Sequence, residues 1–77
     1  MHQFKIHIRS PLQIREFVNL AMIQPFDVLV GNEAQQINGK SFMGMFTLDH
    51  SQPVNVTVRC SDEEFGRFRS AANAIAL

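Results

Sequence analysis

A short helix in the middle of the chain is the feature that most limits how this sequence can fold. The stretch Asn38–Leu48 (NGKSFMGMFTL) contains a turn, a serine and an apolar segment. Serine is a preferred residue at the N-terminal cap of a helix, so Ser41 is expected to cap a helix that runs to Leu48. The helix carries four large apolar side chains: Phe42, Met43, Met45 and Phe46. A helix this short cannot bury all of them, so part of its apolar surface should be exposed.

Four segments are expected to form strands, because apolar and polar residues alternate along them or turn signals bound them. They are Phe4–Arg9, Phe26–Val30, Ala34–Asn38 and Val54–Cys60. The apolar residues should face a core and the polar residues should face solvent. Gly31–Glu33 is a turn typical of hairpins, and it joins the second strand to a short, polar third strand anchored by Ile37.

Two longer helices are predicted from their start signals. Ser10 suits the cap of the first, Pro11 its first helical position, and Gln13 the completion of a capping box. The apolar stripe of this helix is Ile14, Phe17, Val18 and Ala21, and Pro25 ends it. The last helix starts with a capping box at Ser61–Glu64, where acidic side chains suit the helix dipole. Its apolar stripe is Phe65, Phe68, Ala72 and Ile75.

The composition argues against several classes of function. A chain of 77 residues is expected to form one domain, residues 1–77. Seven Lys and Arg balance seven Asp and Glu, which argues against a nucleic-acid binder that relies on a strong positive field. Cys60 is the single cysteine and the three histidines are scattered, so no metal and no other cofactor is expected. Neither a membrane span nor a signal peptide is visible, which fits a cytoplasmic protein.

The segment Lys40–Leu48 (KSFMGMFTL) is similar to the pattern Lys-Ser-Ile-Met-Gly-Val-Met-Ser-Leu, the regulatory-serine segment of HPr. HPr is the histidine-containing phosphocarrier family of the bacterial sugar phosphotransferase system, and the expected element order resembles it over nearly the whole chain. The resemblance implies an α+β, HPr-like open-faced sandwich. In it, a four-stranded antiparallel sheet carries two long helices and one short helix on one face, in the order β-α-β-β-α-β-α. A ferredoxin-like βαββαβ module is the nearest competitor, and the short helix favours the HPr arrangement.

The chain departs from the family at the loop that carries its chemistry. HPr proteins have the pattern His-x-Arg-Pro at the start of the first helix, whereas this chain has Arg9-Ser10-Pro11 in a shorter loop. Ser10 falls at the position of the family's phosphoacceptor histidine. A serine phosphate ester is much less reactive than a phosphoimidazole, so Ser10 is expected to act only as a helix cap.

The remaining histidines are interpreted as ordinary surface residues. His2 lies in an expected frayed terminus, His7 points to the open face of the sheet, and His50 lies in the loop after the short helix. None is expected at the start of a helix, where free N–H groups would favour a phosphate. His50 is the strongest exception, because it lies near the candidate docking surface.

The resemblance gives the short helix two candidate roles. In HPr of Gram-positive bacteria the serine that matches Ser41 is phosphorylated by a dedicated kinase, and a phosphate at a helix N-terminus is tolerated. The alternative is that Ser41 is only a cap. Phe42, Met43 and Phe46 match the positions through which HPr docks its partners, and Met45 is expected to face the core. The same apolar patch could instead close a homodimer or belong largely to the core.

These features favour an HPr-like regulatory or protein-docking module related to the phosphoenolpyruvate-dependent sugar phosphotransferase system. It would lack histidine phosphotransfer and enzymatic activity, and it would bind a protein partner through the Ser41–Phe46 helix rather than a nucleic acid or a membrane. The catabolite-repression homologue of HPr is the precedent, since it too lacks the active histidine and keeps the serine. Two alternatives stay open: a phosphocarrier with a displaced phosphoacceptor, and a small ferredoxin-like binding module.

Overall fold

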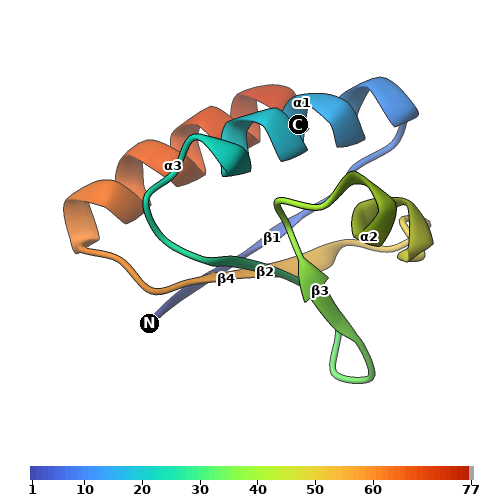
Figure 1. Ribbon diagram of the computed structural model, residues 1–77, viewed down its shortest axis with the longest axis horizontal. Helices are drawn as coiled ribbons and strands as arrows, with labels where there is room; N and C mark the ends of the chain where they lie inside the picture. Colours follow the sequence, from blue (N-terminus) through green and yellow to red (C-terminus); the bar gives the residue numbers. More distant parts are fainter. Residues whose placement is uncertain (77) are drawn as a thin grey trace.

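The computed structural model describes residues 1–76 as a four-stranded antiparallel sheet with three helices. The elements, in chain order, are β1 (His2–Ile6), α1 (Pro11–Met22), β2 (Val28–Gly31), β3 (Gln36–Asn38), α2 (Phe42–Thr47), β4 (Val54–Val58) and α3 (Asp62–Ile75). The strands lie in the order β1-β4-β2-β3, and α1 and α3 lie side by side over one face of the sheet (Figure 1). The predicted α+β open-faced sandwich is confirmed, including the short helix that separates it from the ferredoxin-like alternative.

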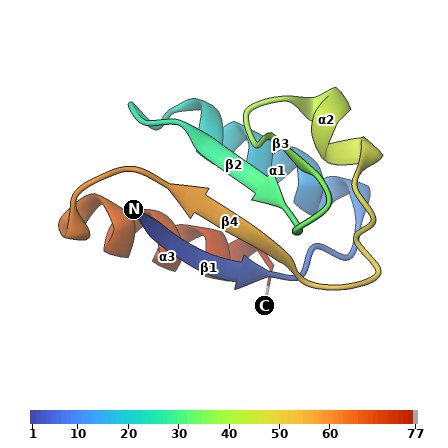
Figure 2. The same ribbon diagram turned by 90° about the horizontal axis from the view of Figure 1, so that it is seen from below.

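The second face of the sheet is open. Seen from below in Figure 2, the strands lie in front of α1 and α3, and α2 lies beside the β3 edge of the sheet. The buried valines of β2 and β4 alternate with more exposed residues, because successive side chains of a strand point to opposite faces. No helix within residues 1–76 is both long and apolar enough to cross a bilayer.

The two long helices are held to the sheet by a cluster of aromatic rings. Phe68 of α3 packs against Phe4, Phe17 and Phe26, with ring centroids 6.0, 6.1 and 5.7 Å apart. These three rings come from β1, from α1 and from the segment before β2. Aromatic pairs of this kind contribute about 0.5–1.5 kcal/mol each beyond their burial. All four apolar residues predicted for the stripe of α1 are buried against this core.

The start of α1 differs in one detail from the prediction. Ser10 is the cap, and its hydroxyl oxygen accepts a hydrogen bond from the Gln13 backbone N–H at 3.2 Å. The Gln13 side chain does not complete a capping box with Ser10. Its Oε1 accepts from the backbone N–H of Arg9 at 2.6 Å, one residue earlier. Its Nε2 donates to the Ile75 carbonyl at 3.2 Å, so Gln13 ties the start of α1 to the end of α3.

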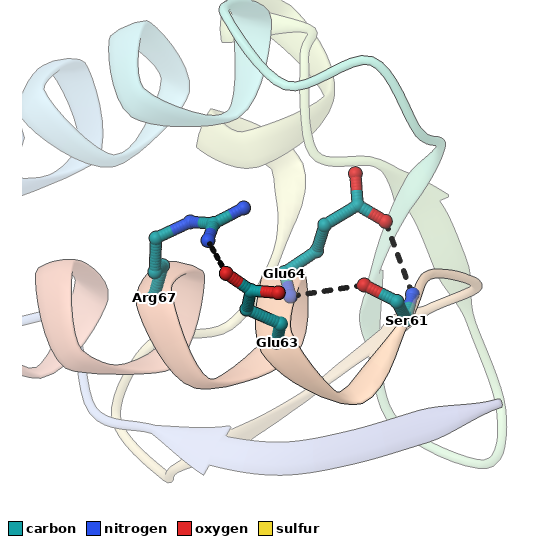
Figure 3. A network of polar contacts seen from close by, with 4 residues as sticks. All are labelled: Ser61, Glu63, Glu64 and Arg67. Carbon is teal, nitrogen blue, oxygen red and sulfur yellow. Dashed lines mark hydrogen bonds and ion pairs between the residues drawn. The ribbon is translucent and has the colours of Figure 1, made fainter.

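The capping box of α3 is confirmed (Figure 3). Ser61 Oγ accepts from the Glu64 N–H at 3.1 Å, and Glu64 Oε1 accepts from the Ser61 N–H at 3.1 Å. One turn later, Arg67 forms an exposed ion pair with Glu63 at 2.8 Å. A capping serine contributes about 1 kcal/mol to helix stability, whereas the exposed ion pair contributes at most a few tenths.

The outer strands do not run where the alternation predicted. β1 begins at His2 and ends at Ile6, because it pairs with β4 in a register that joins His2 to Val58 and Ile6 to Val54. Pro53 precedes Val54 and has no N–H to extend the ladder. Beyond β1 the alternation of burial still holds, since Ile8 is fully buried. The sequence pattern therefore predicted the buried face correctly but misplaced the strand ends.

The hairpin between β2 and β3 is longer than the predicted turn. Asn32 Oδ1 accepts hydrogen bonds from the backbone N–H groups of Ala34 and Gln35, each at 2.9 Å. The Asn32 N–H donates to the Gln35 carbonyl at 2.8 Å. Ala34 and Gln35 therefore belong to the turn, and β3 begins at Gln36 instead of Ala34.

Candidate functional site

The turn before α2 is fixed by side-chain and backbone hydrogen bonds. Asn38 Oδ1 accepts from the Lys40 N–H at 2.9 Å, and the Asn38 carbonyl accepts from the Ser41 N–H at 3.0 Å. Gly39 packs tightly against β2: a Cβ at this position would lie 2.8 Å from Val28 Cγ1 and 2.9 Å from Val30 Cγ2. A residue larger than glycine would push the turn away from the sheet. The starting point of α2 is thus set by the sheet below it.

Ser41 is the N-cap of α2, as the sequence predicts. Its Oγ accepts from the Gly44 N–H at 3.1 Å, and its carbonyl accepts from the Met45 N–H at 3.0 Å. The residue is half-buried. A hydroxyl that only accepts here keeps its own hydrogen free, so the bond to Gly44 does not use up the group that a kinase would modify.

Lys40, next to this cap, is already engaged elsewhere. Its Nζ donates to the Gln24 carbonyl at 3.0 Å, just beyond the C-terminal end of α1. The last turn of α1 contains no basic residue of its own, and a positive charge near a helix C-terminus is favourable. Lys40 therefore joins the end of α1 to the start of α2.

The apolar residues of α2 divide into an inner and an outer set. Met45 is completely buried, whereas Met43 is 78 % exposed and Phe46 is 54 % exposed. Phe42 lies between the two sets, because it is half-buried and packs against the core. Its assignment to the outer surface therefore needs correction: Met43 and Phe46 carry most of the exposed apolar surface of this helix.

A hollow of about 370 Å³ joins the start of α1 to the end of α2. It is lined by Ile8, Arg9, Ser10, Pro11, Ile14, Phe46, His50 and Ser51. The loop after α2 thus returns to the capping serine of α1 and brings His50 beside it. The sequence did not predict that His50 and Ser10 border the same hollow. The sequence contains no local signal for it, since the contact spans a large separation along the chain.

His50 is held in one orientation. Its Nε2 lies 2.6 Å from the Met45 carbonyl oxygen, and because a carbonyl can only accept, this nitrogen carries the hydrogen. The other ring nitrogen, Nδ1, then has a free lone pair. It is buried and has no hydrogen-bond partner within residues 1–76. His50 is therefore part of the structure at the end of α2, and the expectation of an ordinary surface histidine was wrong.

His2 also differs from its prediction. Its ring stacks on Phe65 with centroids 4.4 Å apart and planes at 13°. Its Nε2 lies 2.9 Å from Asp62 Oδ1, in the first turn of α3. His2 is thus part of β1 and fastens that strand to α3 instead of lying in a frayed terminus. Because its nitrogen faces a carboxylate, the contact differs from the amide cradle that a phosphate would need.

The loop around His50 has its own internal support. Asp49 Oδ1 accepts from the Ser51 N–H at 2.9 Å. Hydrogen bonds from the Ser51 side chain and backbone hold the pKa of Asp49 below its ordinary value, because they favour the ionised carboxylate. Asp49 is fully exposed, so this bond shapes the loop and does not bury a charge.

No family model and no curated protein matches this sequence. Several solved structures are similar to it in fold, including the following three. HPr-C-His from Thermoanaerobacter tengcongensis is 21 % identical, with a TM-score of 0.77 over 97 % of this chain and 94 % of that one. The phosphocarrier protein HPr from Bacillus anthracis is 19 % identical, with a TM-score of 0.74 over 99 % and 96 %.

The third structure is Crh, the catabolite repression containing protein of Bacillus subtilis, described as an intertwined dimer with a swapped domain. It is 20 % identical, with a TM-score of 0.65 over 96 % of this chain and 88 % of that one. The identities are low, and the shared property is the fold over nearly the full length of each chain.

Proposed function

We propose that this chain, which has the fold of HPr, is a cytoplasmic, non-enzymatic docking protein related to the sugar phosphotransferase system. It binds a protein partner through α2 and does not pass on a phosphoryl group from the start of α1. The observation that carries the proposal is the exposure of Met43 and Phe46 on a helix whose start and end are both fastened. A rigid apolar surface of this kind is suited to recognition.

The docking surface is defined as Met43 and Phe46, with Phe42 behind them. Burying a large apolar side chain that was exposed contributes about 1.5–3 kcal/mol. Met43 and Phe46 can therefore contribute substantially to the free energy of binding a protein partner. Leu12, on the neighbouring α1, is also 53 % exposed. α1 packs against α2, and Pro11 and Ile14 of α1 border the same hollow as Phe46.

The absence of histidine phosphotransfer at the usual position is supported by the role of Ser10. Its oxygen accepts the Gln13 N–H and therefore already has a structural function. A phosphoserine at this place would also be too inert to transfer its group onward. Ser10 is thus proposed to be a cap alone.

Variants of the exposed residues test the docking surface. The immobilised chain is exposed to an extract of its host, and the proteins retained are quantified. Met43→Glu and Phe46→Glu place a charge in the proposed interface and should remove the specific partner. Leu29→Glu is the matched control, because Leu29 is 42 % exposed but lies on the open face of the sheet. Equal retention by the control and both α2 variants would contradict the proposal.

Ser41 is proposed to regulate this surface. A phosphoryl group there adds up to about two negative charges at the start of α2, two residues from Met43. Incubation with an HPr-type serine kinase and ATP should label the wild type and Ser10→Ala but not Ser41→Ala. Labelling that persists in Ser41→Ala would remove the regulatory role and leave Ser41 as a cap.

A second candidate function is phosphotransfer through His50, and one observation favours it. Nε2–H is held by the Met45 carbonyl, so the free lone pair is on Nδ1, and the ring borders the same hollow as Arg9 and Ser10. In such a transfer the phosphoryl donor is a phosphohistidine of another protein. The Nδ1 lone pair of His50 forms the new P–N bond, and the electron pair of the broken P–N bond returns to the nitrogen of the donor histidine. Burial of Nδ1 argues against it, because the ring must turn before the nitrogen can react.

Incubation with phosphoenolpyruvate and the first enzyme of the phosphotransferase system separates the two functions. Docking without phosphotransfer predicts no acid-labile phosphate on the chain. A displaced acceptor predicts labelling that is lost in His50→Ala and kept in His7→Ala.

A homodimer is the remaining alternative use of the apolar surface. Crh is described as an intertwined dimer, so self-association of this fold has a precedent. Light scattering of the wild type and Phe46→Glu tests it. A dimer that dissociates in the variant would assign the surface to a second copy, whereas a monomeric wild type would exclude this use.

A further inference from the structure

A second hollow lies on the open face of the sheet, away from the helices. Its volume is about 450 Å³, and the side chains that border it include Asp27, Leu29, Asn38, Thr57 and Arg59. Leu29 pairs with both Asn38 and Thr57 in the sheet. Their neighbours Val28, Val30, Val56 and Val58 are buried on the helical side, so the hollow opens on the face seen in Figure 2.

Two opposite charges border this hollow without pairing with each other. Val28 lies opposite Val58 in the register, so Asp27 and Arg59, the next residues outward, flank that pair. Opposed residues of neighbouring strands are close enough for an ion pair. The ion pairs formed within residues 1–76 are His2–Asp62 and Glu63–Arg67. The Asp27 carboxylate and the Arg59 guanidinium are therefore both available to a bound molecule.

The base of the hollow is apolar in an otherwise polar surface. Leu29 is 42 % exposed, although its face of the sheet is occupied mainly by polar side chains. Asn38 and Thr57 flank it as neutral hydrogen-bonding groups. Thr57 Oγ1 already accepts from Gln3 Nε2 at 3.2 Å, which fixes its position. The hollow thus combines one acid and one base with two apolar residues, Leu29 and Met1, which also borders it.

We propose that this hollow binds a free α-amino acid with an apolar side chain. The ammonium group pairs with Asp27, the carboxylate forms a two-pronged contact with Arg59, and the side chain lies on Leu29. A dicarboxylate would be repelled by Asp27 and a diamine by Arg59, so the charge pattern selects a zwitterion. The volume is in the range of small-molecule sites, which are about 300–1,000 Å³. The site is separate from α2 and does not depend on the docking function.

Titration with L-leucine, followed by backbone amide NMR, tests the site directly. Saturable shifts are expected at Leu29, Thr57 and Arg59. N-acetyl-leucine lacks the ammonium group and leucinamide lacks the carboxylate, so each should bind about two- to fivefold more weakly than leucine. The docking variant Phe46→Glu should bind leucine like the wild type, which keeps this test independent of the proposed partner surface.

Charge-removing variants complete the test. Arg59→Gln and Asp27→Asn should each weaken leucine binding by about two- to fivefold, and both are at exposed positions where the fold tolerates the change. Arg69→Gln is the control, because Arg69 is an exposed cation on α3. The proposal is overturned if leucine causes no saturable shifts, if the three compounds act alike, or if both variants bind as the wild type does.

Discussion

α1 and α2 both begin at a serine whose hydroxyl oxygen accepts a hydrogen bond from the backbone N–H three residues later. Ser10 is followed by a helix of 12 residues with four buried side chains, and Ser41 by a helix of 6 residues with one. In α1 the cap supports a face that belongs to the core. In α2 it supports a helix with most of its apolar surface outside. Capping chemistry fixes where each helix begins, and helix length decides how much apolar surface is left for a partner.

The largest expected effect separates the inner and outer sets of α2. Met45→Ala should lower the free energy of unfolding by about 2–5 kcal/mol, because it leaves a cavity where a fully buried side chain was. Met43→Ala should change it by less than about 0.5 kcal/mol, since that side chain is exposed. Urea denaturation of both variants measures the difference. Similar losses would mean that α2 has no distinct outer face.

The next effect concerns the turn from which α2 starts. Gly39→Ala should cost about 1–3 kcal/mol, because the added Cβ would meet Val28 and Val30. Gly66→Ala is the matched control: its Cβ would have nothing within 4 Å, and replacing a glycine within a helix should stabilise by about 0.5–1 kcal/mol. Thermal unfolding of the two variants should shift in opposite directions. A neutral Gly39→Ala would show that the turn is free to move.

Removing the two caps compares the helices directly. Ser10→Ala should lower the free energy of unfolding by about 1 kcal/mol. Ser41→Ala removes an equivalent bond but should have a smaller global effect, because a helix of 6 residues can fray without unfolding the rest. Hydrogen exchange should instead show faster exchange at the Gly44 amide. A larger global loss for Ser41→Ala than for Ser10→Ala would reverse this comparison.

The smallest expected effect is the pH dependence of the loop after α2. Because the folded pKa of Asp49 is lowered, its contribution to stability is present above the unfolded value of about pH 4 and is lost as pH falls through the folded pKa. Ser51→Ala removes the side-chain hydrogen bond that contributes most to the lowered pKa, so NMR titration should give a higher Asp49 pKa in the variant. An unchanged pKa would show that the Ser51 side chain does not hold this loop.

The element order and the buried faces could be predicted, because they depend on local signals. Ser10, Ser41 and Ser61 each mark a helix start, and side-chain alternation marks the face of each strand toward the core. The ends of the strands were harder to predict from the sequence, because they depend on where the partner strand begins and ends. The N-terminal limit of β1 follows from the pairing of His2 with Val58, which no pattern near His2 indicates.

The candidate site was only partly predictable for the same reason. The cap at Ser41 and the burial of Met45 follow from spacing within one helix. The contact of His50 with the Met45 carbonyl, and its approach to Ser10, depend on how a loop folds back. The sequence predicted Phe42 on the outer surface, but Phe42 packs against the core. The spacing within a helix of 6 residues does not show which side chains the neighbouring elements cover.

The sheet order β1-β4-β2-β3 has a consequence for how the chain is made. β1 has β4 as its neighbour, so β1 cannot pair until Val54–Val58, which comes much later in the chain, has been synthesised. During that interval Phe4 and Ile6 have no sheet to cover them. Non-local pairing of this kind slows folding and leaves nascent chains open to aggregation. The apolar face of β1 therefore stays uncovered longer during synthesis than a strand that pairs with its neighbour in sequence.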